Sequence, residues 1–576
     1  MTATTDLPDL DVAIVGGGVS GLYAGWRLLT APPDDTTPPG AWARAAGGRL
    51  RVTLFEGSDR VGGRLLSATS PHLPGTVCEI GGMRYVHPDQ KLVAGLVETV
   101  LKLPYHAQTV DRDENIAFLR GRLLRSRDLG TPGLLPYHLD QAEASWLAAR
   151  PGGAPAAMIG RVLKALLPGL EAARATGRLR EFLATAEVDG LALHKHGFWN
   201  LLARGMSPDA YQAARATIGY DCLGGNTNAA DLAAEYFDFG KDVEYRMLDD
   251  GYERLPWELR GLLERAGGGV ELGRWLGGFE AAPLADGSTG VRLHFLDGGP
   301  VTARALILAM PRRSLELLRR AGPVLDDDAV RARLGTVTPV PLYKLFLVYQ
   351  EPWWQQAGVS RGRSLTDLPL RQCYYWPTDP RACPAATGPA AIMAYNDLLN
   401  VSFWAGLRTL PDPSRPSLHP RTARRYAAAR QAGAATPHFG RAAAPQPLAA
   451  ADDAFAGQLR RNWQQHDASE RMVAEMHRQL RQMHGVDDAP GPIDAAFADW
   501  ADDPYGGGVH LWNVGLPSGE VEQDMTQPRP GFPCYVCGEA YSTRQTWVEG
   551  ALRTAEIVLQ RRLGLPAPAW APEAIR

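Results

Sequence analysis

The chain has 576 residues, which is too many for a single hydrophobic core, so we expect more than one domain. Hydrophobic residues make up 45% and charged residues 21%, as in an ordinary soluble globular protein. The formal net charge of −3 argues against nucleic acid as a partner. Residues 1–11 do not resemble a signal peptide, and no apolar run approaches the ~20 residues that span a bilayer. We therefore expect no membrane association and a cytoplasmic location.

The first predicted element is a strand over residues 12–15, which a glycine-rich turn joins to a helix beginning at residue 22. The turn reads GGGVSG, so that GxGxxG falls on Gly16, Gly18 and Gly21, with Ser20 between them. In this context the first glycine makes the tight turn, the second lets a pyrophosphate approach, and the third lets the helix pack on the strand. The helix N-terminus then faces the phosphates. The pattern predicts a dinucleotide site.

The next strand is predicted over residues 50–55 and ends at Glu56, where a carboxylate can accept hydrogen bonds from a ribose 2′-OH. The usual distance between the two motifs is ~20 residues. It is longer here because residues 31–48, rich in proline, alanine and glycine, form a predicted surface insertion. Strand, turn, helix and terminal acid together favour a dinucleotide far more strongly than the glycine motif alone.

Two glycine pairs followed by an arginine come next: residues 62–64 read GGR, and residues 81–84 read GGMR. A glycine pair carries no Cβ, so its backbone can lie flat against a large planar ligand. Arg84, two residues after the second pair, would provide a planar, bidentate receptor for a carboxylate. If the planar ligand is a flavin, the site oxidises a compound that carries a carboxylate.

The remaining chain alternates between helical and strand-like segments. Residues 92–250 are predicted to be largely helical. Strands are predicted at residues 270–272, 291–295, 305–309, 341–354 and 372–376, a loop-rich insertion at about 407–451, and an amphipathic helix at 469–485 with Gly485 as its stop. Residues 534–560 return to strand, turn and helix.

These elements predict an α/β fold whose nucleotide half is assembled from discontinuous segments. A Rossmann-like domain would comprise residues 1–91, 250–340 and 490–576. Residues 92–249 would form a largely helical region with the substrate entrance, and residues 341–489 an inserted α+β substrate-binding domain.

Six cysteines give no disulfide framework. Cys534 and Cys537 have CxxC spacing, but they lie in a strand-like run, where residues three apart point to opposite faces. We therefore expect two buried structural thiols rather than a redox pair. No cluster with metal-ligand spacing is apparent, and we predict no metal site.

The motifs resemble, in matching order, those of the flavin-dependent amine oxidase superfamily, and within it the L-amino-acid oxidases. The resemblance spans nearly the whole chain. Its motifs are the GxGxxG, Glu56 with the GGR, the GGMR, Lys344 before EPWW at 351–354, TDLP at 366–369 before Tyr374 and Tyr375, and GEA at 538–540 before TWVEGA at 546–551. Arg84 favours the amino-acid branch, because this position is non-basic in relatives that oxidise simple amines. The resemblance implies the amine oxidase, glutathione-reductase-like flavoprotein fold.

The family implies FAD as the cofactor. Some relatives attach flavin through a Cys in the segment that matches residues 505–510, and no Cys occurs there, so we predict non-covalent FAD. The resemblance assigns Arg64 to the diphosphate, Glu539 to hydroxyls on the ribityl or diphosphate side, the Leu276 backbone to the adenine, and the helix near Trp547 to the flavin pyrimidine. The complete implied set is Gly16, Gly18, Ser20, Gly21, Glu56, Gly63, Arg64, Gly82, Met83, Arg84, Leu276, Gly538, Glu539, Trp547 and Val548.

The resemblance also implies a reaction. The Cα hydrogen of the substrate passes to flavin N5 as hydride, the imino acid hydrolyses to a 2-oxo acid and ammonia, and O2 reoxidises the flavin to give hydrogen peroxide. Arg84 would clamp the substrate carboxylate, and Tyr375 or Tyr374 would be its second contact. Only one of these adjacent strand residues can face the substrate, and the motif alignment favours Tyr375. Lys344 matches the lysine that holds a water against flavin N5.

Four further residues are implied to contact the substrate. Trp547 would form an aromatic wall beside the flavin, and the Thr546 carbonyl would accept a hydrogen bond from the substrate amine. Val509 stands where relatives often have a bulky aromatic residue, which would open the side-chain pocket. Glu235 lies on a segment that lines the substrate entrance in relatives. An acid there would favour cationic side chains, although a solvated helix face is the favoured interpretation.

An L-amino-acid oxidase, acting on an L-amino acid as its small-molecule substrate and on O2, and dimeric by association with the family, is therefore the first hypothesis. An amino-acid 2-monooxygenase, which decarboxylates the substrate to an amide, would use the same site and is an alternative. Arg84 argues against a monoamine or polyamine oxidase. The joint presence of Arg84, Lys344, Tyr375 and Trp547 argues against a flavin-binding protein without turnover.

Overall fold

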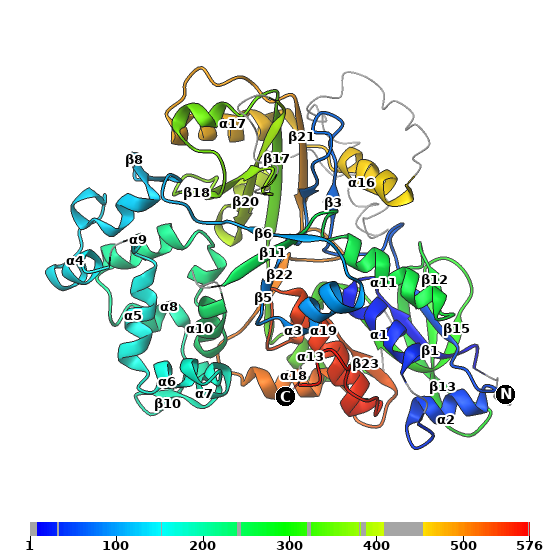
Figure 1. Ribbon diagram of the computed structural model, residues 1–576. Helices are drawn as coiled ribbons and strands as arrows, with labels where there is room; N and C mark the ends of the chain where they lie inside the picture. The colour runs from blue at the N-terminus through cyan, green and yellow to red at the C-terminus, as the bar shows by residue number, and fades with distance from the viewer. Residues whose placement is uncertain are drawn as a thin grey trace.

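The computed structural model describes residues 8–31, 34–150, 152–238, 243–318, 324–379, 381, 388–407, 453–573 and 575. Within them, two sheets of seven strands each organise the fold (Figure 1). No helix among these residues is long and apolar enough to cross a membrane. The predicted insertion at about 407–451 and Cys383 lie outside the described residues, apart from Leu407.

The first sheet joins strands from distant parts of the chain. Its order is β12-β2-β1-β15-β14-β13, and β23 also pairs with β15. Strands β12, β2, β1, β15 and β23 are parallel, whereas β14 and β13 are antiparallel. The bounds are β1 (Leu10–Val15), β2 (Val52–Phe55), β12 (Gly269–Glu271), β13 (Leu276–Pro283), β14 (Thr289–Phe295), β15 (Val301–Leu308) and β23 (Cys534–Val536). This parallel core agrees with the predicted α/β class.

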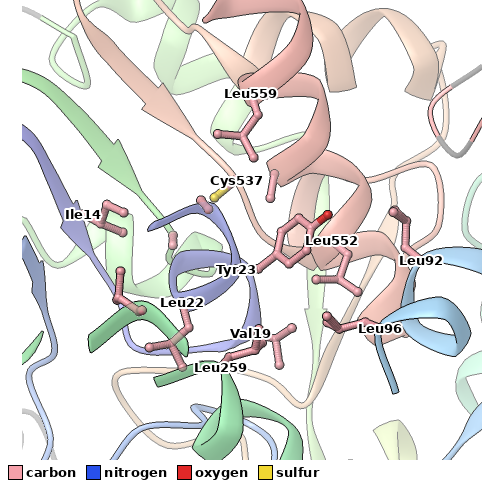
Figure 2. Packing of buried hydrophobic residues seen from close by; sticks show 14 of the residues in the cluster. Ile14, Val19, Leu22, Tyr23, Leu92, Leu96, Leu259, Cys537, Leu552 and Leu559 are labelled. Atoms are coloured by element: carbon pink, nitrogen blue, oxygen red, sulfur yellow. The ribbon is translucent and has the colours of Figure 1, made fainter. Parts of the chain in front are cut away.

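Helices from the two ends of the chain pack beside this sheet. In Figure 1, α1 (Val19–Thr30, blue) lies beside α19 (Val548–Ile557, red), and α11 (Arg254–Arg265) also packs on α1. Figure 2 shows the buried interface, in which Leu22 of α1 and Leu552 of α19 are both fully buried. A buried ion pair between Arg27 and Glu556, 2.8 Å apart, joins the same two helices. The N- and C-terminal segments therefore share one core.

The second sheet has the order β21-β17-β20-β19-β18-β7-β8. The bounds are β7 (Ile116–Leu119), β8 (Arg122–Arg125), β17 (Leu342–Tyr349), β18 (Arg363–Thr366), β19 (Gln372–Trp376), β20 (Ala390–Asp397) and β21 (Asp494–Asp499). Helix α17 (Glu470–His484) packs on one face through Met472, Met476 and Leu480. It is capped by Ser469 and ends at Gly485, which has a φ of 66°, so the predicted helix is confirmed.

A helical region and smaller elements complete the fold. The region comprises α4 (Gln141–Ala148), α5 (Ala157–Leu166), α6 (Leu170–Ala175), α7 (Leu179–Thr185), α8 (Phe198–Leu202), α9 (Pro208–Ile218) and α10 (Ala229–Asp238). A small three-stranded sheet contains β5 (Tyr85–His87), β11 (Glu244–Leu248) and β6 (Tyr105–Gln108). Three further sheets have two strands each: β16 (Val337–Val340) with β22 (Val509–Trp512), β3 (Ser67–Ala68) with β4 (Cys78–Glu79), and β9 (Glu187–Val188) with β10 (Leu191–Ala192). Remaining helices include α2 (Pro38–Ala45), α3 (Lys91–Ala94), α12 (Arg312–Glu316), α13 (Asp328–Leu334), α14 (Val401–Ala405), α16 (Ala454–Gln465) and α18 (Ser518–Thr526).

The prediction of a largely helical segment at 92–249 was wrong at its two ends. Strands β6, β7 and β8 lie near its start, and β11 lies near its end. Apart from β8, which pairs with the adjacent β7, these strands have partners distant in sequence, since β7 pairs with β18 and β11 pairs with β5 as well as β6. Such pairing overrides local propensity in strands of four or five residues. The predicted insertion at 31–48 contains helix α2, which Thr37 caps through its side chain.

The two cysteines of the CxxC pattern are buried on opposite sides of the first sheet. Cys534 belongs to the core that contains Phe55 and Trp512, whereas Cys537 packs with α1 and α19 (Figure 2). Burial raises the pKa of the Cys537 thiol to about 12. The interpretation as two structural thiols is confirmed.

Candidate active site

A large cavity lies between the glycine-rich end of the first sheet and the second sheet. Fourteen of the fifteen residues predicted to contact the cofactor line it, namely Gly16, Gly18, Ser20, Glu56, Gly63, Arg64, Gly82, Met83, Arg84, Leu276, Gly538, Glu539, Trp547 and Val548. The exception is Gly21, where a Cβ would lie 2.1 Å from the Gly16 carbonyl oxygen. That contact agrees with the packing role expected of the third glycine.

The turn between β1 and α1 forms an open cradle. Gly16 has a φ of 115°, and a Cβ there would lie 2.3 Å from the carbonyl oxygen of Ala309, so only glycine is accommodated. A Cβ at Gly18, in contrast, would meet no protein atom within 4 Å and would enter the cavity. Gly18 is also the N-cap of α1, whose free N–H groups favour a phosphate. The residues present therefore fit the diphosphate of FAD.

Two acids border the cradle. Glu56 accepts hydrogen bonds from the Gly17 amide at 2.6 Å and from Ser58, and so closes the loops around the cavity. Glu539 accepts a hydrogen bond from Arg64 at 2.9 Å and contacts His510. Burial alone would raise the pKa of Glu539, but the positive charge of Arg64 and the contact with His510 hold it at about 2. The ionised carboxylate can accept hydrogen bonds from cofactor hydroxyls.

Arg84 is a buried cation whose contacts are neutral. Its guanidinium donates to Gln108 at 2.9 Å and to the Tyr220 hydroxyl at 3.1 Å, and it lies 4.0 Å from the centroid of the Tyr245 ring. No carboxylate pairs with it anywhere in the described chain. A buried charge without a counter-ion is costly, and its exposed edge faces the cavity. Arg84 is therefore suited to an anionic ligand group.

Lys344 lies on β17, next to the edge strand β21 of the second sheet, and lines the cavity. Its Nζ donates to the backbone carbonyls of Glu79 at 3.1 Å and Gly81 at 2.5 Å. Strand β17 is paired on both sides, by β20 and β21, so Lys344 does not lie on a sheet edge. Burial lowers the pKa of Lys344 to about 7, although the charge of Glu79 opposes this shift. The amine of Lys344 therefore loses its proton at a lower pH than that of an exposed lysine.

The structure contradicts the choice of Tyr375 as a substrate contact. Its side chain lies on the face of the sheet that packs on α17, where the hydroxyl contacts Ser364 at 2.6 Å and His484 at 2.8 Å. Tyr374 faces the other way, as strand alternation requires, but it does not line the cavity. Its hydroxyl instead contacts that of Tyr220 at 2.8 Å, so Tyr374 supports the residue that binds Arg84.

Tyr395 is a cavity residue that the motifs did not identify. It lies on β20 directly opposite Lys344, and its ring centroid is 5.1 Å from the lysine Nζ. It also packs edge-on against Tyr220, with the ring centroids 5.4 Å apart. Residues 390–397 form a mostly apolar run without alternation, and the register of this strand against its neighbour is not visible in the sequence.

Thr546, Trp547, Val509 and Glu235 all line the cavity. Glu235 is only 5% exposed, so the favoured interpretation of a solvated helix face was wrong for this residue. Its Oε1 accepts hydrogen bonds from the Thr546 hydroxyl at 2.5 Å and from the Trp547 indole at 3.0 Å. Burial first, and the nearby charge of Asp238 second, raise the pKa of Glu235 to about 7.

One group outside the cavity has the residue types of a metal site. The possible ligand atoms of His106, Asp249 and Asp379 lie within 4.8 Å of one another. The guanidinium of Arg381 donates to both aspartates and supplies the positive charge there. We therefore assign no metal ion to these three residues.

Comparisons with known proteins show the family to which the chain belongs. The family model described as flavin containing amine oxidoreductase matches residues 19–413 and 454–559. Aplysianin-A of Aplysia kurodai is 24% identical over 96% of this chain and 90% of its own length. L-amino acid oxidase Bs29 of Bothriechis schlegelii is 23% identical over 69% of this chain and 70% of its own length.

The solved structures support the same fold. A structure of putrescine oxidase bound to putrescine superimposes with a TM-score of 0.60 at 17% identity, covering 96% of this chain and 98% of that one. The solved structures agree in fold, and the family match confirms the superfamily and the cofactor predicted from the motifs. The chain belongs to the flavin-containing amine oxidoreductases and is an FAD-dependent oxidoreductase of that family.

Proposed function

We propose that the chain catalyses the oxidative deamination of an L-amino acid to the 2-oxo acid, ammonia and hydrogen peroxide. The observation that carries the proposal is Arg84, a buried guanidinium on the cavity wall with neutral protein contacts and no carboxylate partner in the described chain. A substrate carboxylate would supply the missing counter-ion through two parallel hydrogen bonds. A simple amine would leave this charge unpaired, and an amine cation would be repelled by it.

Residues around Arg84 would hold the substrate in one orientation. The Tyr395 hydroxyl would be the second carboxylate contact in place of Tyr375, since Tyr395 is the one that lines the cavity. The carbonyl of Thr546 would accept a hydrogen bond from the amine, and the indole of Trp547 would flank the carbon that reacts. The L-configuration rests on the resemblance and on the name of the Bothriechis relative.

FAD, when bound, supplies the redox chemistry by accepting two electrons and the Cα hydrogen and returning the electrons to O2. The chain contributes binding, orientation and control of protons. We assign Lys344 to hold a water molecule in the cavity, because its amine has a free position beyond the two backbone carbonyls. The depressed pKa of about 7 would let this amine donate to or accept from that water near neutral pH.

The proposal predicts that Arg84→Met abolishes the preference for amino acids. With FAD-loaded protein, peroxide and ammonia would be measured for L-amino acids, their D-enantiomers and the amines that lack the carboxylate. We expect kcat/KM for L-amino acids to fall at least ~30-fold in the variant, because losing one partner of a buried charge pair costs about 2 kcal/mol or more. Activity on amines, where present, should not fall.

Arg478→Met is the matched control, because Arg478 lies on α17, pairs with Glu475 and does not line the cavity. Flavin absorbance would show that each variant retains its cofactor. Oxidation of amines alone by the natural protein would contradict the proposal. Production of an amide from the amino acid would identify the monooxygenase alternative instead.

A further inference from the structure

The cavity contains a carboxylate that lacks a cationic partner. Glu235 lies on α10, and only its Oε1 receives hydrogen bonds, from Thr546 and Trp547. No donor to its second oxygen and no ion pair to the side chain occur among the described residues. The nearby cation Arg180 pairs with Asp238 instead. The carboxylate therefore has a hydrogen-bonding position left for a ligand.

A second acid on the cavity wall is already satisfied. Asp397 accepts hydrogen bonds from the backbone amides of Asp221 at 2.9 Å and Cys222 at 2.8 Å, one to each carboxylate oxygen. These two hydrogen bonds hold the Asp397 carboxylate against the protein backbone. Glu56 and Glu539 border the cofactor cradle, so Glu235, rather than Asp397, is the acid outside the cradle whose carboxylate has an oxygen available to a bound molecule.

The surfaces next to Glu235 are apolar. The cavity is also lined by Leu223, Val509 and Leu511, which belong to the same hydrophobic cluster as the alanines and Leu232 of α10. An apolar channel that ends at a carboxylate matches a side chain with a methylene stem and a positive head. Val509 leaves room for that stem, because it is smaller than the aromatic side chains expected at this position.

We propose that Glu235 selects substrates whose side chain ends in an ammonium or guanidinium group, so that the preferred substrates are L-amino acids such as lysine and arginine. This inference rests on the function proposed above. Arg84 would bind the α-carboxylate and Glu235 the distal cation, so the two opposite charges of the cavity would bind the two ends of one substrate. The hydrogen bonds of Glu235 to Thr546 and Trp547 would couple recognition of the side chain to the residues that flank the amine.

The test compares two substrates of equal length and shape. L-lysine carries an ammonium where L-2-aminoheptanoate carries a methyl group, and the ratio of their kcat/KM values isolates recognition of the charge. We expect the natural protein to prefer lysine, and Glu235→Gln to lower the ratio by at least ~30-fold. Glutamine retains an oxygen that can accept from Thr546 and Trp547 while removing the negative charge.

Asp231→Asn is the matched control variant. Asp231 lies one turn earlier on the same helix, is partly buried and accepts a hydrogen bond from Ser518, but it does not line the active-site cavity. The same loss of an acid there should leave the substrate ratio unchanged. FAD content measured by absorbance would verify that both variants fold.

The pH dependence of the ratio is a second readout that needs no variant. Glu235 must be ionised to bind a cation, and its pKa near 7 means that ionisation occurs around neutral pH. The charged groups that act on it are Asp238 on its own helix and Arg180 on α7, with the Cys222 thiol nearby. Preference for lysine should therefore increase as pH rises through about 7. As a control, the ratio of the kcat/KM values for L-leucine and L-2-aminoheptanoate should stay constant over the same pH range.

The outcomes separate this inference from the proposed function. Equal use of lysine and 2-aminoheptanoate would overturn the role of Glu235 and leave amino-acid oxidation intact. An equal fall in kcat/KM for lysine and 2-aminoheptanoate in Glu235→Gln would also overturn the role of Glu235 in selecting cationic side chains. In that case Glu235 would only position Trp547. No turnover of any amino acid would mean that the proposed function itself fails.

Discussion

Four tyrosines surround the two cations of the active site. Tyr220 and Tyr245 contact Arg84, Tyr374 supports Tyr220, and Tyr395 lies beside Lys344. Their phenol groups satisfy the guanidinium without neutralising it, because they hydrogen bond and offer their ring faces while carrying no charge. The positive charge of Arg84 therefore stays available to a ligand.

Substitution of single tyrosines should show which face of the second sheet contacts the substrate. Tyr395→Phe should raise KM for amino acids about tenfold by removing one hydrogen bond to the carboxylate, with little change in stability. Tyr375→Phe should leave KM unchanged and lower the free energy of unfolding by about 1–3 kcal/mol, because His484 and Ser364 lose a buried partner. Steady-state kinetics and denaturant unfolding would measure the two effects. The reverse pattern would restore Tyr375 as the substrate contact.

The sequence motifs identified some of these active-site residues and missed others. Arg84, Lys344 and Trp547 could be found because each lies beside a recognisable string. Tyr395 could not, because its position depends on which strand pairs with β17. Glu235 gave a weak signal, since it follows Leu232 by three residues on the apolar side of α10, but its charge favoured solvent exposure.

Two glycines of the turn between β1 and α1 should have different roles: Gly16 is needed for folding, and Gly18 for cofactor binding. Gly16→Ala would place a Cβ against the Ala309 carbonyl and should impair folding, seen as loss of soluble protein or of thermal stability. Gly18→Val would place its side chain in the cavity and should give a folded protein that lacks FAD. Circular dichroism and flavin absorbance would separate the two results. Full FAD content in Gly18→Val would contradict the cradle assigned to this turn.

Elements defined by local chemistry were predictable. The turn with its flanking strand and helix, and α17 with Ser469 before it and Gly485 after it, are specified by residues adjacent in sequence. Strands β6 and β7 were missed because they are short and are stabilised by partners that lie more than a hundred residues away, β11 and β18 respectively, and β8 pairs only with β7 among the described strands. Long-range pairing of this kind leaves little trace in local composition.

At the scale of the whole molecule, the cofactor cavity joins segments that are far apart in sequence. Its walls include residues near position 16, near position 276 and near position 539, and α1 and α19 share one core (Figure 2). A ligand that contacts all of these segments would be bound by the native chain and not by the unfolded chain. Its binding energy would therefore add to the stability of the entire FAD-binding part.

Removal of FAD should consequently destabilise the protein, and its return should restore stability. At an FAD concentration 1,000 times Kd the gain is about 4 kcal/mol. For a chain of this length the gain corresponds to a rise in Tm of about 3 °C. Differential scanning calorimetry of apo-protein titrated with FAD would measure the shift, and Gly18→Val, which should not bind FAD, is the control. FAD should leave with acid or chaotrope because the predicted attachment is non-covalent, and flavin that remained on denatured protein would refute that prediction. A Tm independent of FAD would mean that the segments lining the cavity hold together without the cofactor.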